Sequence, residues 1–178
     1  LKAVAPVRKS LGVRNFFNVL GPLVNPVQPR HQMLGVYNLA MSRLYSYIYQ
    51  AENKRFSIVH SLDGYDEISL TDRFKVVSNR GEQLFSPSDL GFDVIPQEAL
   101  YGGDTPEEAS QIFRRVLAAE GTQAQMNAVL ANAAFGIQTI EQQKSIGECL
   151  EMAKDALYGL KALRTLEKFI AINKTECQ

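Results

Sequence analysis

Net charge, cysteine and long apolar runs are all scarce in this sequence, and each absence excludes a class of protein. The 19 basic side chains are balanced by 19 acidic ones, so the formal net charge is zero. Without an overall field, any anion site must come from local arginines and backbone amides. No run approaches the ~18 apolar residues that a membrane span needs, and we see no signal-peptide pattern. We therefore expect no nucleic-acid partner and no membrane partner.

The only two cysteines are Cys149 and Cys177. They form no Cys-x-x-Cys pair and have no histidine neighbour, so the sequence does not predict a zinc site. Cys149 falls on the apolar face of a predicted helix. We expect two reduced, structural thiols and a cytoplasmic location.

The overall composition is that of an ordinary soluble globular domain. Hydrophobic residues make up 46% and charged residues 21% of the 178 residues, enough for one domain with a real core. The sequence opens at Leu1 without a methionine, and its first residues resemble the end of a helix already under way. That opening favours a chain that lacks an amino-terminal part.

Hydrophobic periodicity predicts an α/β fold with a mixed sheet. A strand at 33–37, a helix at 40–51 and a strand at 55–60 make a parallel crossover unit. The helix places Leu44, Tyr47 and Ile48 on one face. Two further strands, 74–78 and 82–85, flank Asn79-Arg80-Gly81, where Gly81 can take the positive φ of a hairpin turn.

The rest of the chain is predicted to be helical. Thr105-Pro106-Glu107-Glu108 is a capping-box sequence with proline at the first helical position. Apolar residues then repeat at helical spacing, and three more helices follow at about 123–137, 141–158 and 160–172. The expected buried stripe of the last helix is Leu163, Leu166, Phe169 and Ile170.

Four segments could carry chemistry, and two of them lie near the amino terminus. Arg8 and Arg14 are separated by a break at Gly12, so both can face one region and bind a carboxylate or phosphate. They are also explained as a solvated helix end and a structural arginine, and spacing favours that explanation. Gly21-Pro22 lies in an apolar stretch with Asn25-Pro26, and because the prolines break helix and strand alike we expect much of the stretch to be buried but irregular. It either lines a ligand or forms an awkward core turn.

The other two segments are an acidic loop and a glycine pair. The sequence after the strand at 55–60 carries Asp63, Asp66 and Glu67 at the carboxyl end of a parallel strand, where α/β sheets bind ligands. It is either a magnesium site shared with substrate phosphates or a solvated acidic loop. Gly102-Gly103-Asp104 is better explained as a helix cap than as a phosphate cradle.

Several of these motifs together resemble the signature of anthranilate phosphoribosyltransferases. The resemblance covers nearly the whole chain in order, and its specific blocks are the first one and the Asp-Gly-x-Asp-Glu block. The matching stretches are Val7-Arg8-Lys9-Ser10-Leu11-Gly12-Val13-Arg14, Phe17-Asn18-Val19-Leu20-Gly21-Pro22-Leu23, Asn25-Pro26, Gln32-Met33-Leu34-Gly35-Val36-Tyr37, Asp63-Gly64-Tyr65-Asp66-Glu67-Ile68-Ser69, Gly102-Gly103-Asp104 and Asn132-Ala133-Ala134.

The resemblance implies a reaction and a role for five residues. The family transfers phosphoribose from phosphoribosyl pyrophosphate to the amine of anthranilate in tryptophan biosynthesis. By motif, Arg8 engages the anthranilate carboxylate, and Gly21 and Pro22 form the apolar wall near its ring. Asp66 and Glu67 bind Mg²⁺ on the pyrophosphate side. No residue of this chain is expected to act as a covalent catalyst.

The resemblance also implies that part of the site lies outside these 178 residues. The family's Gly-Thr-Gly-Gly-Asp loop and Lys-His-Gly-Asn segment do not occur in the sequence, nor does the helical domain that forms the family's homodimer. We therefore expect residues 1–178 to be the carboxy-terminal portion of the α/β domain of a nucleoside phosphorylase/phosphoribosyltransferase-like fold, inactive alone. We also expect an uncovered apolar patch near residues 1–25.

Two other functions are open. A pyrimidine nucleoside phosphorylase shares the architecture but would bind thymine or uracil, and the Asp66-Glu67 pair argues for the metal-dependent transferase instead. A non-catalytic paralogue that binds nucleic acid would need a basic surface, which a net charge of zero opposes.

Overall fold

The computed structural model describes residues 20–176, and the chain divides into two compact units, 1–30 and 31–178. In the first unit, residues 20–30 form successive turns. The amides of Leu23 and Val24 both donate to the Leu20 carbonyl oxygen, and Asn25 accepts from Val27 and Gln28. The irregular backbone predicted from the two prolines is confirmed here. The predicted burial is wrong for Val24, which is 52% exposed.

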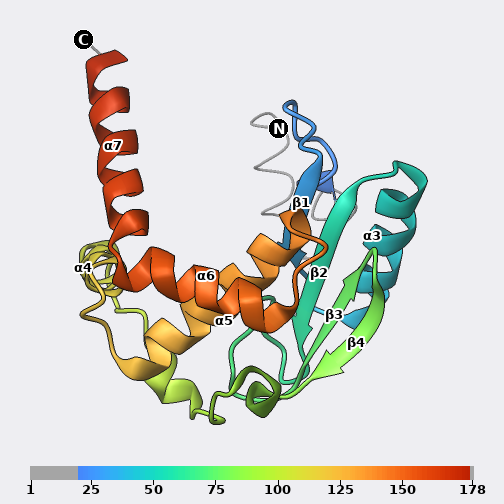
Figure 1. Ribbon diagram of the computed structural model, residues 1–178, viewed down its shortest axis with the longest axis horizontal. Coiled ribbons are helices and arrows are strands. Elements are labelled where there is room, and N and C mark those ends of the chain that lie inside the picture. Colours follow the sequence, from blue (N-terminus) through green and yellow to red (C-terminus); the bar gives the residue numbers. More distant parts are fainter. Residues whose placement is uncertain (1–19, 177–178) are drawn as a thin grey trace, which may run out of the picture. The chain divides into compact units, whose positions relative to one another are not determined.

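The second unit is built on a four-stranded mixed sheet in the order β1-β2-β3-β4 (Figure 1). Strands β1 (His31–Gly35) and β2 (Arg55–Ser61) are parallel, joined by helix α3 (Leu39–Ala51). Strands β3 (Phe74–Ser78) and β4 (Gly81–Phe85) continue the sheet in antiparallel fashion. Gly81 turns the hairpin with φ at 108°. The predicted α/β class, crossover unit and hairpin are confirmed.

Helices cover both faces of this sheet (Figure 1). Alternation along β2 sends Phe56 and Ile58 towards α3 and sends Ser57 and Val59 towards α5 (Gln123–Ile140). The core on the α5 face combines aromatic and aliphatic side chains of β2, β3, the loops and α5: Val59, Ile68, Leu70, Phe74, Val76, Leu90, Ala131 and Phe135.

The remaining helices are α4 (Pro106–Leu117), α6 (Ile146–Tyr158) and α7 (Lys161–Glu176), and short 3₁₀ turns lie at Pro87–Leu90 and Gln97–Leu100. α6 packs along α5 through a second apolar cluster that contains Cys149, whose side chain is fully buried as expected. Burial raises the pKa of the Cys149 thiol. Cys177 lies outside the described residues.

One predicted buried face is wrong, and a second is only partly right. In α3 the predicted face is largely solvent-exposed, with Tyr47 71% exposed, and the helix instead buries Ser42, Tyr45, Ser46 and Tyr49. In α7 the predicted stripe is only partly covered, because Phe169 is 63% exposed. Across residues 20–176, no helix combines the length and the hydrophobicity that crossing a bilayer requires.

Candidate functional site

The acidic residues follow β2 directly, at the edge of the sheet where both parallel strands end. β2 ends at Ser61, which is fully buried, and β1 ends at Gly35. The loop that follows contains Asp63, Asp66 and Glu67 before the chain returns along β3. The structure therefore places the three carboxylates at the carboxyl ends of parallel strands, as predicted, which is where open α/β sheets bind their ligands.

Hydroxyl groups hold the loop from inside. The Ser61 Oγ donates to the Glu67 carbonyl oxygen at 2.7 Å and accepts from the Ser69 amide at 3.2 Å. The Ser69 Oγ lies 2.7 Å from the Thr71 Oγ1, which in turn donates to the Asp63 carboxylate. These hydrogen bonds link the buried end of β2 to the surface of the loop. The Asp63 carboxylate is therefore engaged by a hydroxyl group of the loop itself.

A carboxamide on α5 clamps the other side of the loop. Asn132 accepts from the Ile68 amide at 3.1 Å and donates to the Ile68 carbonyl oxygen at 2.8 Å. Its amide also donates to the Ala128 carbonyl oxygen one turn back. Because Ile68 is buried, its backbone groups have no access to water, and Asn132 supplies the partners that burial demands.

A close backbone contact fixes the position of Asp66. A Cβ atom built on Gly35 would lie 2.0 Å from the Asp66 carbonyl oxygen, far inside any permitted contact. Only glycine therefore lets the acidic loop pack against the end of β1.

Whereas the backbone of the loop is held in place, the side chains of Asp66 and Glu67 are both exposed to solvent. Among the described residues, neither carboxylate enters a hydrogen bond or an ion pair. Glu67 also borders a mostly apolar cavity of about 590 Å³, whose lining includes Tyr65, Leu100, Val129 and Asn132. The acidic pair is therefore rigidly anchored through its backbone and free at its carboxylates.

This arrangement fits a magnesium ion that is shared with a phosphorylated ligand. Mg²⁺ binds through one or two carboxylates and completes its shell with waters and substrate phosphates. Within residues 20–176 there is no cluster of three or more histidine, cysteine or acidic side chains that could hold a metal without such a ligand. The exposed carboxylates of Asp66 and Glu67 supply the one or two protein ligands that Mg²⁺ needs when it also binds substrate phosphates.

The other predicted site residues lie elsewhere in the chain. Arg8 and Arg14 are outside the described residues. Gly21 and Pro22 belong to the first compact unit, where Gly21 is exposed and Pro22 is half-buried. His60 is buried with its Nδ1 2.8 Å from the Val36 carbonyl oxygen, which agrees with its interpretation as a strand-end residue.

The glycine pair before α4 belongs to a helix cap, as predicted. Thr105 accepts from the Glu108 amide at 3.2 Å, while the Glu108 carboxylate accepts from the Asp104 amide at 2.8 Å. In a strict capping box the Glu108 carboxylate would accept from the amide of Thr105. Here it accepts from the amide of Asp104 instead. Gly103 has φ at 93° and packs against Glu108 too tightly for a Cβ.

Sequence reasoning did not identify Gly35, Ser61 or Asn132 as residues that shape the site. Asn132 carried a usable signal, since a carboxamide among the apolar residues of a buried helix must find hydrogen-bond partners. Ser61 and Gly35 offered less, because their roles depend on which loop folds back over the strand ends.

The chain is similar in sequence to known proteins. Residues 1–163 match the model of a family described as "Glycosyl transferase family, a/b domain". The chain is 54% identical over 173 residues to the anthranilate phosphoribosyltransferase of Bacteroides fragilis, covering 97% of this chain and 52% of that protein. It is 46% identical over 168 residues to that of Flavobacterium psychrophilum, covering 94% and 51%.

Solved structures give the same result. Anthranilate phosphoribosyltransferase from Thermus thermophilus superposes with a TM-score of 0.88 at 33% identity, covering 96% of this chain and 51% of that one. The Saccharomyces cerevisiae enzyme in complex with PRPP and Mg superposes with a TM-score of 0.86 at 26% identity, covering 94% and 48%. The chain spans about half the length of the curated relatives it matches.

Proposed function

Because the chain belongs to the glycosyl transferase family, as an a/b domain, we propose that it forms the carboxy-terminal part of an anthranilate phosphoribosyltransferase. The reaction transfers phosphoribose from phosphoribosyl pyrophosphate to the amine of anthranilate and releases pyrophosphate. The observation that carries the proposal is the acidic pair Asp66-Glu67, anchored through its backbone at the carboxyl end of β2 with both side chains exposed to solvent.

Asp66 and Glu67 bind Mg²⁺ on the pyrophosphate side in this proposal. When bound, the ion offsets the negative charge that develops on the leaving pyrophosphate. The contribution of the chain is positional: Gly35, Ser61 and Asn132 hold the loop, so that the carboxylates need little rearrangement when the ligand arrives.

Arg8 orients the nucleophile. Its guanidinium can pair with both oxygens of the anthranilate carboxylate, which aims the amine at the ribose without any proton exchange by the arginine. Gly21 and Pro22 form the apolar wall beside the aromatic ring, where a glycine lets the ring approach the backbone.

The remainder of the site comes from residues outside this chain. The pyrophosphate-binding Gly-Thr-Gly-Gly-Asp loop that the family resemblance implies does not occur in the 178 residues. We therefore expect the chain alone to show no transfer, and we expect the whole enzyme to form a homodimer through a helical domain.

A fusion protein tests this function. The amino-terminal half of the Bacteroides fragilis enzyme is joined to residues 1–178, which replace the 52% of that protein that the chain matches. Loss of anthranilate fluorescence with phosphoribosyl pyrophosphate and Mg²⁺ measures transfer, and we expect turnover by the fusion protein and none by either half.

Arg8→Gln in the fusion protein should raise KM for anthranilate far more than KM for phosphoribosyl pyrophosphate. A folded fusion protein without transferase activity would contradict the proposal. Phosphorolysis of uridine or thymidine by the same protein would support a pyrimidine nucleoside phosphorylase instead.

A further inference from the structure

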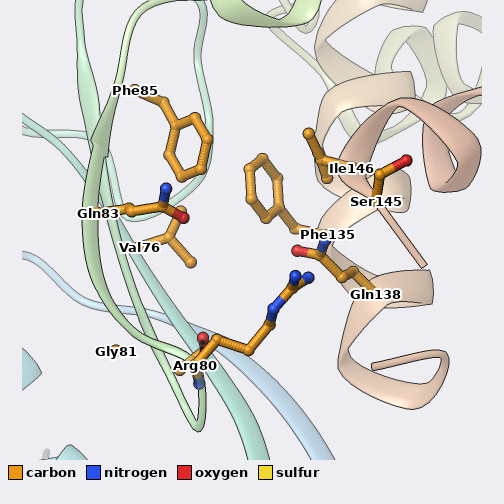
Figure 2. A pocket seen from close by; sticks show the side chains of 10 residues that line it. Val76, Arg80, Gly81, Gln83, Phe85, Phe135, Gln138, Ser145 and Ile146 are labelled. Atoms are coloured by element: carbon orange, nitrogen blue, oxygen red, sulfur yellow. Dashed lines mark hydrogen bonds between the residues drawn. The ribbon is translucent and has the colours of Figure 1, made fainter. Parts of the chain in front are cut away.

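A second cavity opens between the β3–β4 hairpin and the helices α5 and α6 (Figure 2). Its volume is about 460 Å³, within the range of about 300–1,000 Å³ that small-molecule sites occupy. The residues that line it are not those of the acidic loop. The proposed transferase function assigns it no role.

The floor of this cavity is apolar and partly aromatic. Phe85 and Phe135 meet edge to face with ring centroids 5.2 Å apart, and Val76 and Ile146 extend the surface on either side (Figure 2). Phe135 and Val76 are buried and support the floor from below, whereas the half-buried Phe85 and Ile146 supply the apolar surface that a ligand can contact. Such a surface accepts the face or edge of a planar hydrocarbon ring.

Three polar side chains border the floor. In Figure 2 the Arg80 guanidinium points from the hairpin into the cavity, with Gln83 and Gln138 on opposite sides. Arg80 donates through Nη1 to the Lys144 carbonyl oxygen at 3.2 Å, and Gln138 donates to the same oxygen at 3.2 Å. Among the described residues Arg80 forms no ion pair, so most of its five N–H donors are available to a ligand.

The sheet keeps acidic groups out of the cavity. The side chains of Val76, Ser78, Gln83 and Phe85 point to the α5 side of the hairpin, because side chains alternate along each strand. Glu82 therefore points to the opposite side, where it pairs with Lys75.

The carboxylate of Glu148, in the first turn of α6, is already engaged in hydrogen bonds. The Glu148 side chain accepts from the backbone and the hydroxyl of Ser145, at 2.8 and 2.7 Å. Within the part of the chain that the structure describes, no acidic side chain lines the cavity, and its single charged side chain is Arg80. That positive charge favours an anion over a cation or a neutral ligand.

We propose that this cavity is a binding site for a small planar aromatic monocarboxylate. The ring lies on the half-buried Phe85 and Ile146, and the carboxylate pairs with the Arg80 guanidinium through two parallel N–H···O bonds. The carboxamides of Gln83 and Gln138 fix the orientation of the ligand at the rim.

The test is a ¹H–¹⁵N NMR titration of the fusion protein described above with 2-naphthoate and with its neutral isostere 2-naphthamide. We expect saturable shifts of the Gly81 backbone amide and of the Gln83 and Gln138 side-chain amides. Naphthoate should bind about tenfold or more tightly than naphthamide, as a hydrogen-bonded charge pair provides.

Arg80→Gln should remove that preference, lowering naphthoate affinity about tenfold and leaving naphthamide affinity unchanged. The matched control Arg114→Gln, on the exposed face of α4, should alter neither. If Arg80→Gln loses the native spectrum, Gln83→Glu replaces it and should weaken naphthoate alone by charge repulsion. The absence of saturable shifts at these three groups, or equal affinity of the two ligands, would overturn the proposal.

Discussion

At position 35 the chain has room for a hydrogen atom and for nothing larger. The Asp66 carbonyl oxygen occupies the place where a Cβ would lie, at 2.0 Å from it. A single absent methyl group therefore decides where the acidic loop lies over the sheet, and this contact couples the sequence at β1 to the position of the proposed metal ligands.

Replacing Gly35 with alanine should push the acidic loop away from β1. We expect Gly35→Ala to lower the free energy of unfolding by about 1–3 kcal/mol, the usual cost of overpacking, as measured by urea denaturation. The control is Gly136→Ala in the interior of α5, where the nearest atom to a new Cβ is the Met33 sulfur at 3.6 Å. That change should leave stability equal or raise it by about 0.5–1 kcal/mol. Similar losses in both variants would show that the Asp66 contact is not decisive.

Asn132 gives a second prediction at the same scale. Asn132→Ala leaves the amide and carbonyl of the buried Ile68 without partners, and should cost about 1–3 kcal/mol of unfolding free energy. Hydrogen exchange of the Ile68 amide should become faster even under native conditions. Within the described part of the chain, the Asn127 side chain on the same helix bonds only the exposed Gln123 side chain. Asn127→Ala therefore serves as the control and should change neither quantity much. Unchanged Ile68 exchange in Asn132→Ala would refute the clamp.

At the scale of the elements, helix α6 is stabilised by hydrogen bonds in its first turn. Ser145 and Glu148 satisfy each other's backbone amides in a capping box, and these hydrogen bonds from Ser145 lower the pKa of the Glu148 carboxyl. A depressed folded-state pKa stabilises the protein at pH values above the unfolded-state pKa. This stabilisation is lost as the pH falls through the folded-state value.

Ser145→Ala should therefore destabilise the protein more at neutral pH than in acid, where only the pH-independent cap bond from the Glu148 amide to the Ser145 Oγ is lost. The stability difference between the wild type and the variant should shrink as the pH falls below the ordinary glutamate pKa of 4.5 and through the depressed value. NMR titration of the Glu148 carboxyl in the variant should return its pKa towards 4.5. A stability difference that is independent of pH would contradict this origin.

The elements also show how far the sequence alone could go. The strands were predicted to within two residues, because apolar runs bounded by turn residues mark them well, and the hairpin followed from Asn79-Arg80-Gly81. α6 was predicted to begin at 141 but begins at Ile146, where the Ser145 cap starts it. The face of α3 was predicted wrongly: hydrophobicity chose Tyr47, whereas packing on the sheet favours small Ser42 and Ser46 beside Tyr49. The face of α7 was predicted correctly except at Phe169, which is exposed.

For the molecule as a whole, the sequence predicted where the acidic loop lies in the fold, but it did not predict which residues hold that loop in place. The rule that ligands bind at the carboxyl ends of parallel strands predicted the location of Asp66 and Glu67, and the structure agrees. The groups that hold their loop come from β1, β2 and α5, up to 64 residues apart in the sequence, as Asn132 and Ile68 are. A local pattern can indicate that Asn132 needs hydrogen-bond partners, but it does not identify the distant residue that supplies them.

The isolated chain should also associate in solution. We predict an uncovered apolar patch near residues 1–25, and Val24 in the described part of this region is 52% exposed. Light scattering of the chain over a range of concentrations should show a rising mass, and the fusion protein with the Bacteroides fragilis amino-terminal half should not show further association beyond its own oligomer. A monomer at all concentrations would contradict the patch.

The central claim is that Asp66 and Glu67 supply the carboxylates for Mg²⁺ in phosphoribosyl transfer. Its most direct test is kcat/KM of the fusion protein for phosphoribosyl pyrophosphate, measured against Mg²⁺ concentration for the isosteric variant Asp66→Asn/Glu67→Gln. Asp63→Asn is the control, because that carboxylate is engaged by Thr71 within the loop. We predict that the double variant needs far more Mg²⁺ and loses about 10–100-fold or more in kcat/KM, while Asp63→Asn keeps most of the activity. A folded double variant with wild-type turnover at every Mg²⁺ concentration would contradict the account.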